Sequence, residues 1–137
     1  MLNDREAGTQ FKVWDMQDLD AIPFWNKGRA ILIGDAAHAM TPMQGQGGNM
    51  AIEDAKAFTL FGPEVTANEV PDILSKIDSI RRPRTKVVLE STRQTMPNTK
   101  MADRVERMDF INSYNGIRRA LDELETANRL EVAASKM

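Results

Sequence analysis

Residues 28–55 read GRAILIGDAAHAMTPMQGQGGNMAIEDA, and this stretch decides the fold. Its apolar run, Ala30–Ile33, predicts a strand buried on both faces, as in a parallel sheet, and Gly34 ends that strand. A loop rich in glycine follows at residues 45–48, and good helix formers continue from Asn49 to the glycine and proline at 62–63. The predicted order is therefore strand, glycine loop, helix.

The sequence on either side of this stretch differs in character. Before it, Phe11–Trp14 predicts an edge strand, and an acidic connector follows. After it, apolar residues recur at helical spacing, as in Ile73, Ile77 and Ile80, and Pro71, Pro83 and Pro97 divide the segment into about four helices. We expect an α/β fold grading into mostly α, with short strands. Residues 1–62 form the strand-loop-helix segment and residues 63–137 the helical segment, together one domain.

Composition narrows the possible partners. The 137 residues are 42% hydrophobic and 28% charged, as in a soluble globular protein, and the net charge of −2 gives no general attraction to nucleic acid or anionic membrane. There is no cysteine, and no apolar run approaches the roughly 20 residues of a membrane span. We expect a cytoplasmic protein that binds no nucleic acid and does not cross a membrane.

Several residues of the central stretch have chemistry suited to a ligand. A carboxylate after the strand, Asp35, can accept hydrogen bonds from ligand hydroxyls, and small residues such as Ala36 allow close approach to the backbone. Pro42 fixes a turn under which a planar ring can lie. At the start of the following helix, backbone N–H groups favour negative charge on a ligand.

In residue type and spacing, this stretch resembles the second flavin fingerprint of the FAD-dependent aromatic-ring monooxygenases related to salicylate and para-hydroxybenzoate hydroxylase. The resemblance reaches Val13 on one side and Ser91 on the other. It implies an enzyme that hydroxylates an aromatic or similar electron-rich small molecule, with FAD as cofactor and NADH or NADPH as electron donor. The residues implied to bind the cofactor are Asp35, Ala36, Pro42, Gly45, Gly47, Gly48 and Asn49. Met40 and Met43 are candidates for substrate contact, whereas no catalytic side chain and no metal ligand is predicted.

Other polar residues have simpler interpretations. His38, the only histidine, has no partner at a catalytic spacing and is interpreted as a packing or hydrogen-bonding residue. Glu53 and Asp54 lie early in the predicted helix, where acidic residues favour its dipole. The basic cluster of Arg81, Arg82, Arg84 and Lys86 is interpreted as a solvated face.

The chain lacks the family's first dinucleotide fingerprint, Gly-x-Gly-x-x-Gly after a strand. The resemblance therefore implies the C-terminal portion of such an enzyme, and we expect another copy or a chain carrying the N-terminal half to complete the sheet. Two alternatives stay open. One is a truncated relative without redox activity that binds or isomerises a hydrophobic metabolite, and the other is a helical interaction module.

Overall fold

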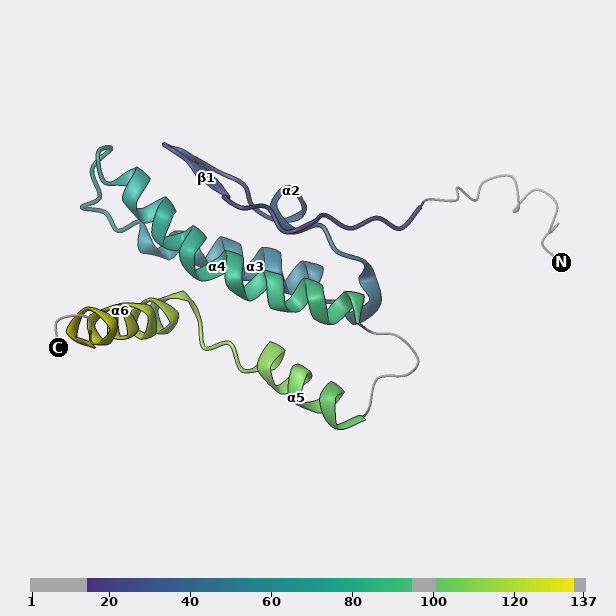
Figure 1. Cartoon of the computed structure of the whole chain (residues 1–137). Coiled ribbons are helices and arrows are strands. Elements are labelled where there is room, and N and C mark those ends of the chain that lie inside the picture. The colour runs from purple at the N-terminus through teal and green to yellow at the C-terminus, as the bar shows by residue number, and fades with distance from the viewer. Residues whose placement is uncertain (1–14, 95–100, 135–137) are drawn as a thin grey trace, which may run out of the picture.

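The computed structural model describes residues 15–94 and 101–134, which form two short strands and a set of helices (Figure 1). The elements are, in chain order, β1 (Asn26–Lys27), β2 (Ala30–Ile31), α2 (Asp35–His38), the 3-10 turn η2 (Pro42–Gln44), α3 (Gly47–Ala57), the 3-10 turn η3 (Phe58–Leu60), α4 (Val70–Arg93), α5 (Met101–Asn112) and α6 (Ile117–Ala134). The expected fold class, mostly α with short strands, is confirmed.

The two strands form a hairpin rather than part of a parallel sheet. β1 pairs with β2 antiparallel, with Asn26 opposite Ile31. Gly28, at φ 58°, begins the two-residue turn between them, where a positive φ matches the twist of the strands. Leu32 and Ile33 are 40% and 46% exposed, so the prediction of a strand buried on both faces is wrong for the described residues.

The predicted helix after the glycine loop is present as α3, which begins at Gly47 and continues into η3. α4 then runs unbroken through Pro83, so the prediction that this proline separates two helices is wrong. An interior proline costs about 3 kcal/mol because it removes one helical hydrogen bond. On either side of it, Arg81 and Arg84 are held by carboxylates of α3, and these contacts offset the cost. Pro71 lies in the first turn of α4, as proline prefers.

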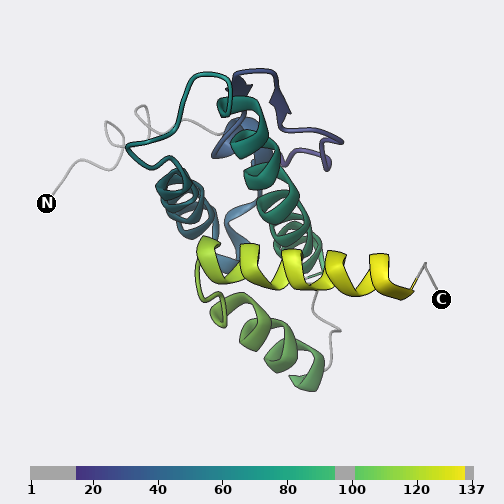
Figure 2. The ribbon, with the colours of Figure 1, turned by 90° about the vertical axis from the view of Figure 1, so that its left-hand side faces the viewer.

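The main core lies where α3, α4 and α6 meet. Figure 2 shows α6 lying across α4, and its buried Ile117 packs with Leu74 and Ile77 of α4. The predicted apolar face of Ile73, Ile77 and Ile80 points into this core, which confirms the helical spacing. A second, smaller cluster joins Met50, Val88 and Ile111. The core thus holds α3 and α4 together, and the start of α3 carries the last three residues of the candidate site.

Two predictions fall wholly or partly beyond the described ranges. The strand at Phe11–Trp14 and the break at Pro97 lie outside the described residues. After residue 63 the described residues form three helices, against about four expected. The division of the chain at residue 62 stays a prediction. Among the described helices, none combines the length and the apolar character needed to cross a bilayer.

Candidate functional site

The carboxylate singled out by the sequence lies on an open edge of the molecule. Asp35 is the first residue of α2 rather than the end of a buried parallel strand, and both Asp35 and Ala36 are exposed. Gly34 before them has φ 58° and ψ −143°, a conformation that essentially only glycine adopts. Within the described residues the Asp35 side chain has no hydrogen-bond or ion-pair partner. It is therefore free to accept hydrogen bonds from a ligand.

The loop that leads into α3 leaves backbone groups available as well. Pro42 is exposed at the start of η2, and Gly45 ends that turn with φ 64°. Gly47 and Gly48 form the first turn of α3, where a Cβ on either would meet nothing within 4 Å. No side chain caps this helix end, so its first N–H groups remain unpaired by the helix itself. The Asn49 side-chain amide donates a hydrogen bond to the Gln46 side-chain oxygen at 3.0 Å.

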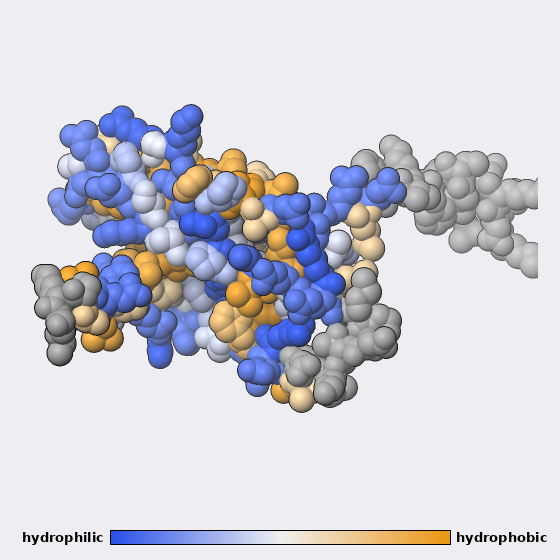
Figure 3. All heavy atoms as spheres, viewed as in Figure 1, coloured by the Kyte–Doolittle hydropathy of each residue, from blue (hydrophilic) through white to orange (hydrophobic). Residues whose placement is uncertain are grey.

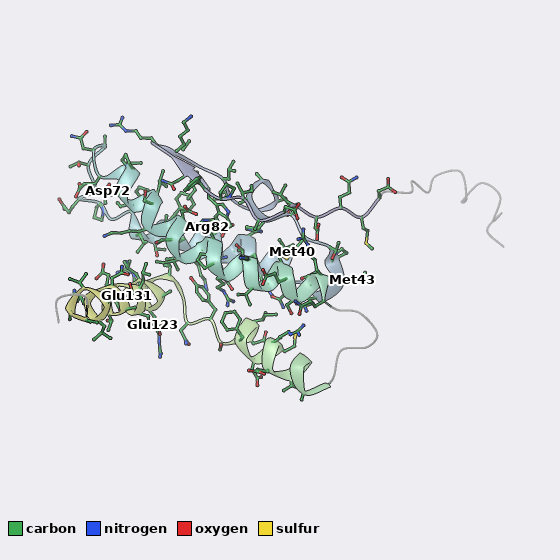
Figure 4. The ribbon with its side chains drawn as sticks, in the orientation of Figure 1. Met40, Met43, Asp72, Arg82, Glu123 and Glu131 are labelled. Atoms are coloured by element: carbon green, nitrogen blue, oxygen red, sulfur yellow. The ribbon has the colours of Figure 1, made fainter. Side chains whose placement is uncertain are left out.

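The two methionines proposed to contact substrate have different surroundings. Met40 is half-buried and packs against the cluster of Met50, Val88 and Ile111. Met43, in η2, is 56% exposed. Figure 4 shows both near the end of α4 that lies opposite Asp72. Met43 is thus accessible to a small molecule, whereas Met40 contributes to packing.

Directly beneath the open edge lies a buried charged cluster that the sequence did not reveal. Asp54 of α3 is 2% exposed and accepts hydrogen bonds from three groups. The donors are the Gly34 N–H at 2.9 Å, Arg81 Nε at 2.9 Å and His38 Nε2 at 2.6 Å. Burial raises the pKa of the Asp54 carboxyl, but the hydrogen bonds from His38, Gly34 and Arg81 outweigh it and bring the pKa below 3.8. Because Asp54 is ionised, His38 Nε2–H donates to it.

The cluster continues to the next acidic residue, Glu53. Its carboxylate accepts two hydrogen bonds from Arg84, both at 2.7 Å, and a third from Arg81. Arg81 is fully buried and Arg84 is 8% exposed. The prediction that these arginines belong to a solvated face is therefore wrong, although it holds for the exposed Lys86. Two guanidiniums face two carboxylates, so the buried charges balance.

Aromatic residues close this cluster on two sides. The Tyr114 ring lies 4.3 Å from the Arg84 guanidinium, a distance suited to a cation–π contact. Burial raises the pKa of Tyr114 above its usual 10.0, against the opposing effect of the nearby Arg81 charge. On the other side, Trp25 packs against the His38 ring with centroids 5.4 Å apart. These contacts exclude water and so strengthen the ion pairs.

The interpretation of His38 as a hydrogen-bonding residue agrees with its buried contact to Asp54. Glu53 and Asp54 lie on the second turn of α3, and their contacts with Arg84 and Arg81 are a structural role that the sequence did not predict. The available signal was the combination of two acidic residues on a helix and two arginines three positions apart on the next. Arginine is the side chain best suited to buried carboxylates.

These features fit a flavin. The unpartnered Asp35 carboxylate suits the hydroxyls of a ribityl chain, and the uncapped end of α3 suits a ring system that gains negative charge. The open space beside Gly47 and Gly48 allows such a ring to approach the backbone. The described residues offer no comparable binding site for the adenine or the pyrophosphate of FAD.

Comparison with known proteins points to the same cofactor. Residues 5–92 match the family described as FAD binding domain. The FAD-dependent monooxygenase phomE of Diaporthe leptostromiformis is 39% identical over 120 residues, which cover 80% of this chain and 33% of that protein. A salicylate hydroxylase of Pseudomonas putida is 39% identical over 85 residues, covering 61% of this chain and 20% of that protein. A 6-hydroxynicotinate 3-monooxygenase of Bordetella bronchiseptica is 44% identical over 54 residues, covering 39% of this chain and 14% of that protein. The chain thus spans a third or less of the length of these relatives.

Proposed function

The chain belongs to the FAD-binding domain family, and on that premise we propose that it supplies flavin-contacting residues to an FAD-dependent monooxygenase. The substrate in this proposal is an aromatic or similar electron-rich small molecule, and NADH or NADPH is the electron donor. A bound flavin supplies electron transfer from the nicotinamide and the activation of O2. The chain's own residues bind and orient that group and adjust its electrostatic surroundings.

Asp35 has the clearest role in this proposal. Its exposed carboxylate accepts hydrogen bonds from ribityl hydroxyls, and such charge-assisted bonds are stronger than neutral ones. The backbone N–H groups of Gly47, Gly48 and Asn49 point outward from the start of α3. The positive end of that helix stabilises negative charge on the reduced ring system. No side chain of this chain is required as a nucleophile or as a proton donor.

The single observation that carries the proposal is the position of these two features within one matched stretch. An unpartnered carboxylate and an uncapped helix end both belong to residues 28–55, the stretch that resembles a flavin fingerprint. A generic turn gives no reason for both groups to be left open. Support for an aromatic substrate comes from the names of relatives such as the salicylate hydroxylase, together with the accessible Met43.

Completion of the site from outside the described residues is also part of the proposal. Phe24, Leu32 and Ile33 leave a large part of their apolar surface exposed beside the hairpin. Figure 3 shows apolar side chains at the surface over β1 and α2. Surface of this kind is typical of a face that another segment or another chain covers. The same covering segment can bring the missing contacts to the adenine and the pyrophosphate.

The test is to measure flavin binding and turnover separately. The protein, produced at its natural length, is titrated with FAD by isothermal calorimetry, and oxidation of NADH and of NADPH is then followed with and without salicylate. We expect FAD to bind and an aromatic compound to accelerate oxidation of the nicotinamide. If FAD binds but no aromatic compound accelerates oxidation of the nicotinamide, the monooxygenase part of the proposal is contradicted. No binding of FAD contradicts the whole proposal and leaves the non-redox relative and the interaction module.

A further inference from the structure

We propose that Asp54 is a positioning residue for the flavin site, and that it holds the Gly34 N–H so that Asp35 faces the ligand. This inference rests on the proposed function, because it assigns a role to a residue that cannot itself touch the flavin. Asp54 is almost fully buried, on the second turn of α3, while Asp35 is exposed on α2. The link between them is one backbone hydrogen bond.

That hydrogen bond acts where the chain has most freedom. Gly34 joins the hairpin to α2 with φ 58° and ψ −143°, and glycine has many alternative conformations in the absence of a constraint. Asp54 Oδ2 accepts the Gly34 N–H at 2.9 Å and so fixes the orientation of the Ile33–Gly34 peptide, on the N-terminal side of Gly34. The carbonyl of Gly34 then accepts the N–H groups of Ala37 and His38 at 2.9 Å each. Both polar groups of Gly34 are therefore fixed from the protein side.

The Asp54 carboxylate is itself held from two directions. Arg81 of α4 donates to Oδ1 at 2.9 Å and also reaches the Met50 carbonyl of α3 at 3.1 Å. His38, at the other end of α2, donates to Oδ2 at 2.6 Å. Asp54 thus connects both ends of α2 to α3 and α4. Through this connection the packing of α4 determines where Asp35 lies, although α4 has no residue on the open edge.

The variant Asp54→Asn releases one contact selectively. An asparagine keeps a single oxygen for three donors, and the permanently charged Arg81 competes for it most strongly. Its amide NH2 then faces His38 and Gly34. His38 can respond by moving its proton to Nδ1 and accepting at Nε2, because the two tautomers interconvert. The Gly34 N–H cannot respond and is left without its acceptor.

The first measurement needs no flavin. Amide hydrogen exchange of residues 34–38 is compared by NMR in wild type, in Asp54→Asn and in the control Asp78→Asn. Asp78 is a fitting control because it too is buried on a helix and bonded to an arginine, Arg82, at 2.8 Å, yet it makes no contact with Gly34. We expect exchange at Gly34 to accelerate by about tenfold or more in Asp54→Asn alone. Unchanged exchange at Gly34 overturns the proposal, whether or not FAD binds.

The second measurement is FAD affinity in the same three proteins at their natural length. We expect Asp54→Asn to weaken binding by about tenfold or more and Asp78→Asn to leave it near the wild-type value. Equal losses in both variants reduce Asp54 to a structural residue and overturn the proposal. A wild type that binds no FAD while Asp54→Asn still frees Gly34 contradicts the proposed function and with it the role toward flavin. Only the statement that Asp54 orders the turn at Gly34 then remains supported.

A milder pair covers the case in which Asp54→Asn does not fold. Arg81→Lys keeps the positive charge but cannot reach both Asp54 and the Met50 carbonyl, so Asp54 is held less firmly. Arg82→Lys is its control, on the half-exposed side of the same helix. We expect faster exchange at Gly34 and weaker FAD binding in Arg81→Lys only. No difference between the two lysine variants overturns the proposal.

Discussion

Asp35 and Asp54 lie in the same stretch of sequence, yet their surroundings are opposite. Asp35 is exposed and has no partner among the described residues, whereas Asp54 is buried and accepts three hydrogen bonds. The first suits a ligand that is not part of the chain. The second holds the turn that presents the first. Residue type alone therefore does not distinguish a ligand-binding aspartate from a supporting one. The burial of the side chain and its hydrogen-bond partners do.

The same contrast extends to the surfaces around them. The open edge of Asp35, the η2 turn and the start of α3 keeps its polar groups unused, at some cost to the stability of the isolated chain. The buried cluster below it uses two carboxylates and two guanidiniums in balanced pairs. A site of this kind needs rigid support because a shift of about 1 Å in a binding group weakens its contacts. Four predictions test whether the open edge binds the ligand and the buried cluster supports it.

The largest effect is expected from Arg81→Met. Removing the guanidinium leaves the buried Asp54 without its arginine, while Glu53 keeps only Arg84, and breaking a buried pair costs about 3–5 kcal/mol. Urea denaturation measures the free energy of unfolding, and the control Arg119→Met removes the exposed pair with Glu123 for less than about 1 kcal/mol. A loss as small as that of the control contradicts the structural role of the cluster.

The next effect concerns binding rather than stability. Asp35→Ala removes a charge-assisted hydrogen bond of about 1.5–3 kcal/mol, which lowers FAD affinity by roughly 10- to 150-fold. The thermal midpoint should change little, because the carboxylate is hydrated when no ligand is present. Asp72→Ala is the control, since Asp72 is also exposed but lies at the far end of α4 (Figure 4). Unfolding of Asp35→Ala with unchanged FAD affinity reverses the roles assigned to the two regions.

Acid should destabilise the fold through the buried Asp54. Since the pKa of Asp54 is lower in the folded protein than its usual 3.8, Asp54 stabilises the fold at pH values above 3.8. That contribution is lost as the pH falls through the lower folded pKa, by about 1.4 kcal/mol for each unit of difference. Urea titrations over this acid range should show a smaller loss in Asp54→Asn than in wild type. Equal acid dependence in the two proteins contradicts the pairing of Asp54.

The smallest effect should come from Tyr114→Phe. The Tyr114 hydroxyl is buried and has no hydrogen-bond partner of normal geometry among the described residues, so its removal spares an uncompensated polar group. The ring and its contact with Arg84 remain. We expect the free energy of unfolding to stay within about 1 kcal/mol of wild type, whereas Tyr114→Ala loses the stacking and falls further. A large loss in Tyr114→Phe contradicts this expectation and indicates that the hydroxyl interacts with the nearby Arg81.

Much of the local structure was predictable, because it depends on neighbouring residues. The glycine loop and the helix formers after it located α3 to within two residues of its start, and the spacing of Ile73, Ile77 and Ile80 predicted the buried face of α4. The resemblance of residues 28–55 to a flavin fingerprint agrees with the family that matches residues 5–92. Family and cofactor were thus available from the sequence alone.

Three features were decided only by tertiary structure. The apolar run after Gly28 looks buried in sequence, but burial depends on which segments cover it, and its neighbours here are one short strand and α4. Pro83 stays inside a helix because the arginines around it find carboxylates on α3. Arg81 is buried rather than solvated for the same reason. Sequence determined the types of residue and their spacing along the chain, and packing decided which charges meet, because the energy of a charge depends on partners that are distant in sequence.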